Sequence, residues 1–139
     1  MVNTYTQIHI QAVFSVQNRE CIIQNIWKDE LYKNITGIVH NNNHKLLAIN
    51  GMPDHVHVLF GLRPSQSISD LLQDIKGSSS KWINDKRLVR GKFFWQEGFG
   101  AFSYSKLGLP EYFVPANGTT LKSAIFNKIF KIEFYQRCN

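Results

Sequence analysis

Residues 45–62 read Lys-Leu-Leu-Ala-Ile-Asn-Gly-Met-Pro-Asp-His-Val-His-Val-Leu-Phe-Gly-Leu, and this stretch decides the fold. Two short apolar segments, 45–50 and 55–62, flank the turn residues Gly-Met-Pro-Asp at 51–54. Strand-length apolar runs on either side of turn-forming residues are typical of a β-hairpin. The stretch therefore predicts two adjacent antiparallel strands near the middle of the chain.

A helix is expected on each side of this hairpin. Before it, apolar residues recur at intervals of three and four across 24–42, which is the spacing of one helix face. After it, residues 68–83 repeat that spacing. Ser67 or Ser69 can cap this second helix, because a serine hydroxyl accepts a hydrogen bond from a backbone N–H of the first turn.

Three further segments read as strands. Residues 5–14 alternate between apolar and polar side chains, and the short runs 92–96 and 101–105 follow the second helix. With 92–96 as the strand after the second helix, and 101–105 as an optional further short strand, the chain runs strand, helix, strand, strand, helix, strand. This order predicts an α+β fold, the ferredoxin-like split βαβ sandwich, with an antiparallel sheet and both helices on one face.

Composition limits the possible functions. The chain has 139 residues, 43% hydrophobic and 19% charged, which suits one domain with a buried core. Lys and Arg number 16 against 10 Asp and Glu, a formal net charge of +6, so nucleic acid and anionic surfaces are candidate partners. We find no apolar run long enough to cross a membrane and no basic and apolar leader at the N-terminus. We expect a cytoplasmic protein that does not enter a membrane.

His55 and His57 are the strongest candidates for chemistry. On a strand they share one face, and Val56 between them points into the core. Two neighbouring imidazoles can hold one divalent cation, although two ligands alone do not complete a site. The simpler interpretation is that the two histidines lie on the open face of a sheet without binding a metal. The pattern alone does not decide between this interpretation and a metal site.

Cations cluster downstream of the histidines. Six lie within seventeen residues, and such a stripe can bind DNA phosphates or simply form a solvated helix face. Its members are Lys76, Lys81, Lys86, Arg87, Arg90 and Lys92. Arg63, which follows the His-Val-His strand, is a further candidate phosphate contact. Trp95 and Phe99 can stack on bases or serve as core and turn aromatics.

The segment Met52-Pro-Asp-His-Val-His57 resembles the signature of the His-hydrophobic-His (HUH) single-strand DNA endonucleases. More narrowly, it is similar to the IS200/IS605-type transposases and their relatives associated with repetitive extragenic palindromes (REP). The resemblance covers residues 1–106. It also rests on Val13-Phe14, the run Ser67-Ile-Ser-Asp-Leu-Leu-Gln-Asp-Ile-Lys76, Ser78-Ser-Ser80 and Phe94-Trp-Gln-Glu-Gly-Phe-Gly-Ala-Phe-Ser103.

This resemblance implies a protein that recognises a hairpin in single-stranded DNA near the end of a mobile element. It implies Mg²⁺ or Mn²⁺ on His55 and His57, where the ion polarises the scissile phosphate. A tyrosine hydroxyl then attacks, giving a 5′-phosphotyrosine and a free 3′-OH. The resemblance also implies a homodimer, in which each tyrosine helix completes the partner's site.

The sequence departs from the family pattern where the nucleophile is expected. The family has a helix of the form Tyr-Ile-x-Asn-Gln-x-Glu-His-His, and its tyrosine should fall near residues 112–120. Tyr112 lies there, but Phe-Val-Pro-Ala follows it, and a proline disfavours helix at the preceding residue. Tyr135 is the alternative, with Asn139 one helical turn later.

We divide the chain into an HUH core at 1–106 and a divergent tail at 107–139, with an extra C-terminal helix expected at 120–136. Two functions remain open. One is a transposase that cleaves and rejoins hairpin DNA through Tyr112 or Tyr135. The other is a catalytically inactive hairpin-binding remnant, whose tail is altered or encoded in a shifted frame.

Overall fold

The computed structural model describes residues 7–104, and the elements follow one another in the predicted order. They are β1 (His9–Ser15), the short 3₁₀ turn η1 (Gln17–Arg19), α1 (Asn25–Asn41), β2 (Lys45–Met52), β3 (His55–Gly61), α2 (Ile68–Lys86) and β4 (Gly100–Tyr104). The α+β ferredoxin-like prediction is confirmed for this part of the chain. The extra helix expected at 120–136 lies outside the described residues.

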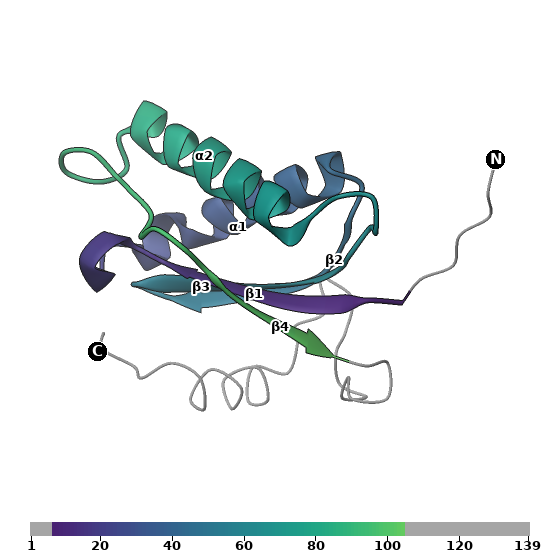
Figure 1. Cartoon of the computed structure of the whole chain (residues 1–139). Coiled ribbons are helices and arrows are strands. Elements are labelled where there is room, and N and C mark those ends of the chain that lie inside the picture. The colour runs from purple at the N-terminus through teal and green to yellow at the C-terminus, as the bar shows by residue number, and fades with distance from the viewer. Residues whose placement is uncertain (1–6, 105–139) are drawn as a thin grey trace.

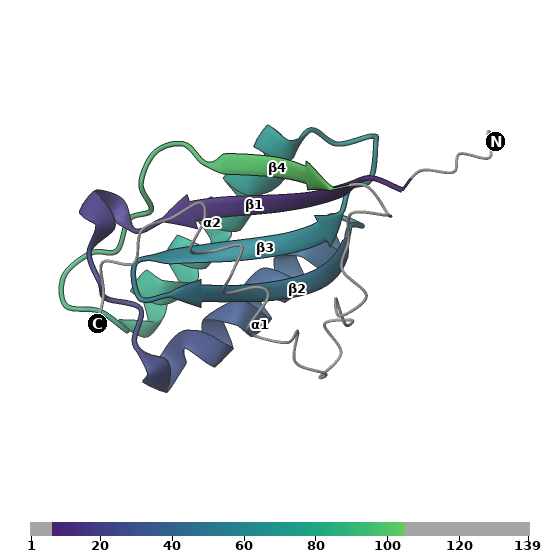
Figure 2. The same cartoon turned by 90° about the horizontal axis from the view of Figure 1, so that it is seen from below.

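The sheet has the strand order β2-β3-β1-β4, and each neighbouring pair is antiparallel. Both helices cover the same face (Figure 1). Seen from below, the four strands lie side by side in front of the helices (Figure 2). The hairpin predicted at 45–62 forms β2 and β3, and it turns at Pro53 and Asp54.

The core lies between the sheet and the two helices. Alternate residues of β3, Val56, Val58 and Phe60, are fully buried and belong to it, as the strand period requires. Alternate residues of β1, from Ile10 to Phe14, join them, as does Val16 just after the strand. Helix α1 contributes its predicted apolar face, including Leu31 and Ile35, which are fully buried. In the part of the chain that the structure describes, no helix is long and apolar enough to span a membrane.

Two serines explain where helix α2 begins and why it continues through its polar middle. Of the two expected caps, Ser67 is the one used, because its Oγ accepts the backbone N–H of Asp70 at 3.0 Å. The helix continues past the serines in its middle. Ser79 is buried there, donates to the carbonyl of Ile75 and accepts the indole N–H of Trp95 at 2.9 Å. The polar side chain that disfavours helix by propensity is thus satisfied inside the core.

The strand predicted at 92–96 is wrong. Only Trp95 pairs there, in a single antiparallel bridge with Val16. The carboxamide of Asn84 instead binds both backbone groups of Phe93, accepting from its N–H at 2.7 Å and donating to its carbonyl at 3.1 Å. Two backbone hydrogen bonds flank the bridge, from Gln17 N–H to the carbonyl of Phe94 at 3.0 Å and from Gln96 N–H to the carbonyl of Ser15 at 2.7 Å, but the pairing does not extend into a strand. The second helix also extends three residues beyond the predicted end, so Lys86 is helical.

Candidate metal centre and nucleic-acid interface

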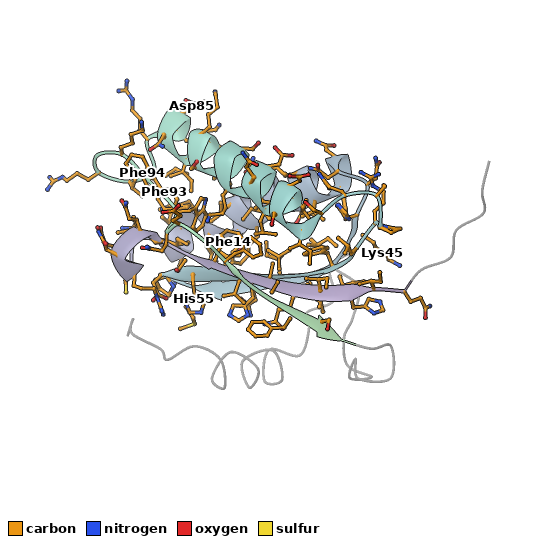
Figure 3. All side chains as sticks on the ribbon, viewed as in Figure 1. Phe14, Lys45, His55, Asp85, Phe93 and Phe94 are labelled. Carbon is orange, nitrogen blue, oxygen red and sulfur yellow. The ribbon has the colours of Figure 1, made fainter. Side chains whose placement is uncertain are left out.

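His55 and His57 lie side by side on the face of the sheet that the helices do not cover. Their ring centroids are 5.3 Å apart, and Val56 points the other way into the core. Figure 3 shows His55 on this face. Both side chains are buried, with exposed fractions of 1% and 0%. The predicted shared face is confirmed, but the histidines are enclosed and do not lie on an open surface.

His55 is held by a carboxylate. Its Nδ1–H donates to Oδ1 of Asp54 at 2.6 Å, and Arg19 Nε donates to Oδ2 of the same carboxylate at 2.8 Å. Asp54 is fully buried, so its charge is held by these two partners. A carboxylate on Nδ1 fixes the tautomer of the ring and leaves the lone pair on Nε2, which is the arrangement common in histidine metal ligands.

His57 is held by an amide. Nε2 of Gln11, on β1, lies 2.6 Å from Nδ1 of His57, and both side chains are buried. Strand register brings them together, because His57 pairs with Val13, whose side chain shares a face with that of Gln11 two residues earlier. An amide can present either its nitrogen or its oxygen to the ring. With the oxygen turned toward Nδ1–H, Nε2 of His57 is left as a lone-pair donor.

Both imidazoles are neutral in the folded protein. Burial lowers the pKa of His57 to about 2, and the adjacent His55 adds to this effect. Burial also lowers the pKa of His55, against the opposing effect of Asp54. Neutral imidazoles are the form that binds metal, since a protonated ring has no lone pair.

These features fit a divalent cation bound through two imidazole nitrogens. The rings are adjacent, neutral and oriented by partners on Nδ1, and the Nε2 atom of each is buried. Within residues 7–104, no group of three or more His, Cys, Asp and Glu side chains could hold a metal ion. Further ligands would therefore have to come from elsewhere: the substrate, water or the rest of the chain.

The predicted DNA-binding cations fall into two groups. Lys86, Arg87, Arg90 and Lys92 are exposed at the C-terminal end of α2 and in the segment after it. This segment lies at the same end of the molecule as the histidines, because Phe94 accepts the backbone N–H of Gln17 and Asp54 accepts that of Val16. These four cations form the exposed basic segment.

The other predicted cations have structural partners. Lys76 Nζ donates to the carbonyls of Gln96 and Gly98, each at 2.7 Å, and therefore ties an irregular segment to α2. Lys81 is exposed and pairs with Asp85 at 2.8 Å, one turn along the helix. Such a surface pair contributes little to stability and leaves the lysine accessible.

Arg63 lies away from the histidines. It follows the far end of β3, since Gly61 pairs with Lys45 while His55 pairs with Met52 at the other end of the hairpin. Its Nε donates to the carbonyl of Asn42 at 3.2 Å, and its Nη1 contacts the hydroxyl of Ser65. Its side chain thus braces the connection between α1 and β2.

Sequence reasoning missed two residues of the site. Gln11 and Arg19 were not singled out, although Gln11 gives a weak signal as a polar residue within a largely apolar strand. The tyrosines proposed as nucleophiles, Tyr112 and Tyr135, lie outside the described residues.

Comparisons with a protein-family model and with a curated protein both match this chain to transposases. The family model described as "Transposase IS200 like" matches residues 4–111. The ISDra2 transposase TnpA of Deinococcus radiodurans is 28% identical over 75 residues, which is 54% of this chain and 54% of that protein. The chain's match thus spans about half the length of this curated relative.

Two solved structures share the fold. A Deinococcus radiodurans protein assigned as a transposase superimposes with a TM-score of 0.70 at 18% identity, covering 98% of both chains. A REP-associated tyrosine transposase, solved bound to a REP hairpin, gives a TM-score of 0.56 at 15% identity. That match covers 76% of this chain and 62% of the other. At these sequence identities, the likeness shows a shared fold and nothing finer.

Proposed function

The chain belongs to the IS200-like transposase family, and from this premise we propose that it binds hairpin single-stranded DNA and cleaves and rejoins it through a 5′-phosphotyrosine. The observation that carries the proposal is the buried pair of neutral imidazoles, His55 and His57, each with a partner on Nδ1. A related transposase has been solved with a REP hairpin, which supports the choice of substrate. We place the activity in the cytoplasm.

His55 and His57 would hold a divalent cation, Mg²⁺ or Mn²⁺. When bound, such an ion supplies charge that polarises the scissile phosphate. The chain's own residues prepare for this role. Asp54 holds the proton of His55 on Nδ1, Gln11 can do the same for His57, and burial keeps both rings neutral. The exposed basic segment adds positive charge for the phosphates that flank the cleaved bond.

Tyr112 is our proposed nucleophile, and Tyr135 is the alternative. In the proposed step the tyrosine oxygen bonds to phosphorus, and the bond from phosphorus to the 3′ oxygen breaks. The tyrosine proton is lost, and the 3′ oxygen leaves as a hydroxyl after gaining a proton. The covalent link conserves the phosphodiester energy for rejoining. We further propose that the functional unit is a homodimer, with the core at 1–106 and the nucleophile in the tail at 107–139.

The second candidate function is hairpin binding without cleavage. It is favoured by the sequence that follows Tyr112, Phe-Val-Pro-Ala, which lacks the Asn-Gln pair of the family's helix. A frame shift in the gene would explain such a tail. The coding DNA tests this directly: another frame beyond codon 106 should encode a helix of the form Tyr-x-x-Asn-Gln. If neither other frame does, the frame-shift explanation is wrong.

A covalent-trapping experiment distinguishes the two functions. The full chain is incubated with Mg²⁺ or Mn²⁺ and with end-labelled, single-stranded hairpins taken from the DNA that flanks its gene. A labelled protein band on a denaturing gel, lost in Tyr112→Phe or in Tyr135→Phe, supports cleavage and names the tyrosine. Binding in solution without any adduct supports the hairpin-binding function. A chain that neither binds nor reacts with these hairpins overturns both proposals.

A further inference from the structure

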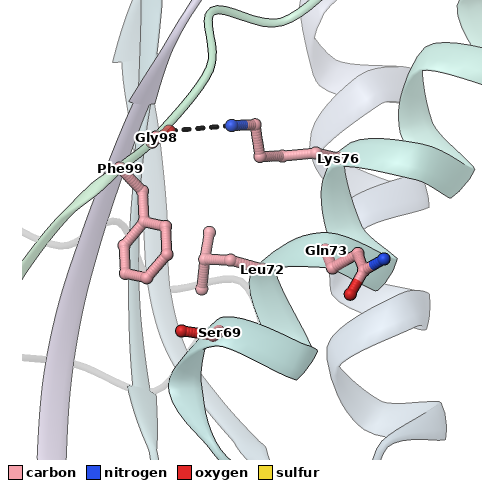
Figure 4. Close-up of a pocket in the computed structure, with 6 residues that line it drawn as sticks. All are labelled: Ser69, Leu72, Gln73, Lys76, Gly98 and Phe99. Carbon is pink, nitrogen blue, oxygen red and sulfur yellow. Dashed lines mark hydrogen bonds between the residues drawn. The ribbon is translucent and has the colours of Figure 1, made fainter.

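A hollow of about 300 Å³ lies between α2 and the segment that leads into β4 (Figure 4). Its volume is at the lower end of the range for small-molecule sites. It lies on the helix side of the sheet and is separate from the two histidines. Its lining comprises Ser69, Leu72, Gln73, Lys76, Gly98 and Phe99.

One wall of the hollow is held in place by a lysine. Lys76 donates to the carbonyls of Gln96 and Gly98, as described above, so the segment before β4 is tied to the helix. Gly98 has a φ of +86°, a conformation that glycine adopts without the penalty other residues incur. The hollow is therefore formed before any ligand arrives.

The lining has the chemistry of a nucleobase site. Leu72 provides a buried apolar floor, and Phe99, which is 40% exposed, lies beside it. Ser69 and Gln73 are exposed lining residues, and the amide of Gln73 points away from Phe99 but, as the end of an exposed side chain, can turn toward the hollow. An exposed aromatic face stacks on any base, and a glutamine amide can donate to and accept from a base edge.

Strand register places this hollow across the sheet from the histidines, two strands away from His57. Phe99 directly precedes Gly100, which pairs with Val13, and Val13 pairs in turn with His57. Two strand spacings of roughly 5 Å each separate Gly100 from His57 across the sheet. In the described sheet β4 is an edge strand, so a flexible DNA strand can pass around it.

We propose that this hollow binds one unpaired nucleobase of the DNA strand a few nucleotides from the phosphate that is cleaved. The inference rests on the proposed function. A base can reach Phe99 in this way only if the cleaved phosphate of the same DNA strand lies at His57. Phe99 stacks on the base, Leu72 closes the apolar side, and the side chain of Gln73 turns to contact the polar edge. Trp95, the other aromatic considered for stacking, is instead a core residue that packs edge-on against Phe14 and Phe93.

The test scans the single-stranded flank of the hairpin with 2-aminopurine, a base whose fluorescence changes on stacking. With the full chain, one flank position should change its fluorescence on binding, and Phe99→Ala should abolish that change. The same substitution should weaken binding of the flanked hairpin about 5- to 150-fold, the effect of losing one stacked base. Binding of the hairpin without its flank should be unaffected.

Phe94→Ala is the matched control, because Phe94 is 47% exposed but does not line the hollow. It should leave the flank signal intact. If Phe99→Ala binds the flanked hairpin as the unaltered protein does, the base-binding inference is wrong and the proposed function stands. If the unaltered protein binds no single-stranded hairpin, the proposed function fails and the inference fails with it.

Discussion

Gln11 Nε2 lies 2.6 Å from Nδ1 of His57, inside the buried contact between β1 and β3. The neighbouring ring has a different kind of partner at the same atom, since Nδ1 of His55 donates to the carboxylate of Asp54. A carboxylate only accepts, so it fixes one tautomer, whereas an amide can favour either. The two histidines are therefore not equivalent as ligands. Asp54 fixes the tautomer of His55, whereas the tautomer of His57 depends on the orientation of the Gln11 amide.

Asp54→Asn should weaken metal binding. The asparagine loses the charge that raises the basicity of His55, and changes to such supporting residues typically cost 10- to 100-fold in affinity. Titration calorimetry with Mn²⁺ measures the loss in the DNA-free protein. Asp85→Asn is the control, because that exposed carboxylate pairs only with Lys81 among the described residues. Equal Mn²⁺ affinities for both variants and the unaltered protein would contradict a supporting role for Asp54.

Replacing Gln11 tests the second ring. Gln11→Leu removes the partner of Nδ1 and should lower Mn²⁺ affinity by about 10-fold or more. Gln11→Glu presents only oxygens, accepts Nδ1–H as Asp54 does, and should retain affinity. Nitrogen-15 NMR of the metal-free proteins reports the tautomer directly. It should show the proton of His57 on Nδ1 in Gln11→Glu but not in Gln11→Leu, and the same tautomer in both would refute this role.

Local pattern predicted the ligand pair but not the distant residues that support it. The alternation of β3 was enough to place His55 and His57 on one face, because the strand period is a property of neighbouring residues. Gln11 and Arg19 are 46 and 35 residues from their partners, and only strand register and the loop path bring them close. The same limit explains why the strand predicted at 92–96 shortens to one bridge, since a side chain of α2, Asn84, binds both backbone groups of Phe93.

The metal-free protein should lose stability as the pH falls below about 6.5. In the unfolded chain an imidazole has a pKa near 6.5, whereas burial lowers the pKa of His57 to about 2. Below pH 6.5 the unfolded state therefore binds more protons than the folded state, and the free energy of unfolding decreases with falling pH. Each such histidine contributes at most about 1.4 kcal/mol per pH unit.

Urea denaturation in EDTA, from pH 7.5 to 4.5, measures this slope. His57→Asn removes one proton-binding group and should flatten the slope, even though the variant is less stable at pH 7.5. Val13→Ala is the control, because Val13 is buried opposite His57 and its truncation destabilises without removing a proton site. A slope that is the same in His57→Asn as in Val13→Ala would mean that His57 is not the source.

The exposed basic segment and Arg63 should respond differently to neutralisation. Lys86→Gln combined with Arg90→Gln should weaken hairpin binding and reduce the dependence of log Kd on log salt by about 1.4, because each phosphate contact to a single strand contributes about 0.7. Fluorescence anisotropy between 50 and 300 mM NaCl, the range in which such contacts are screened progressively, gives the slope. Arg63→Gln should leave it unchanged and lower the melting temperature instead, since Arg63 binds the carbonyl of Asn42. A reduced salt slope in Arg63→Gln, with the melting temperature unaltered, would show that DNA reaches the far end of β3.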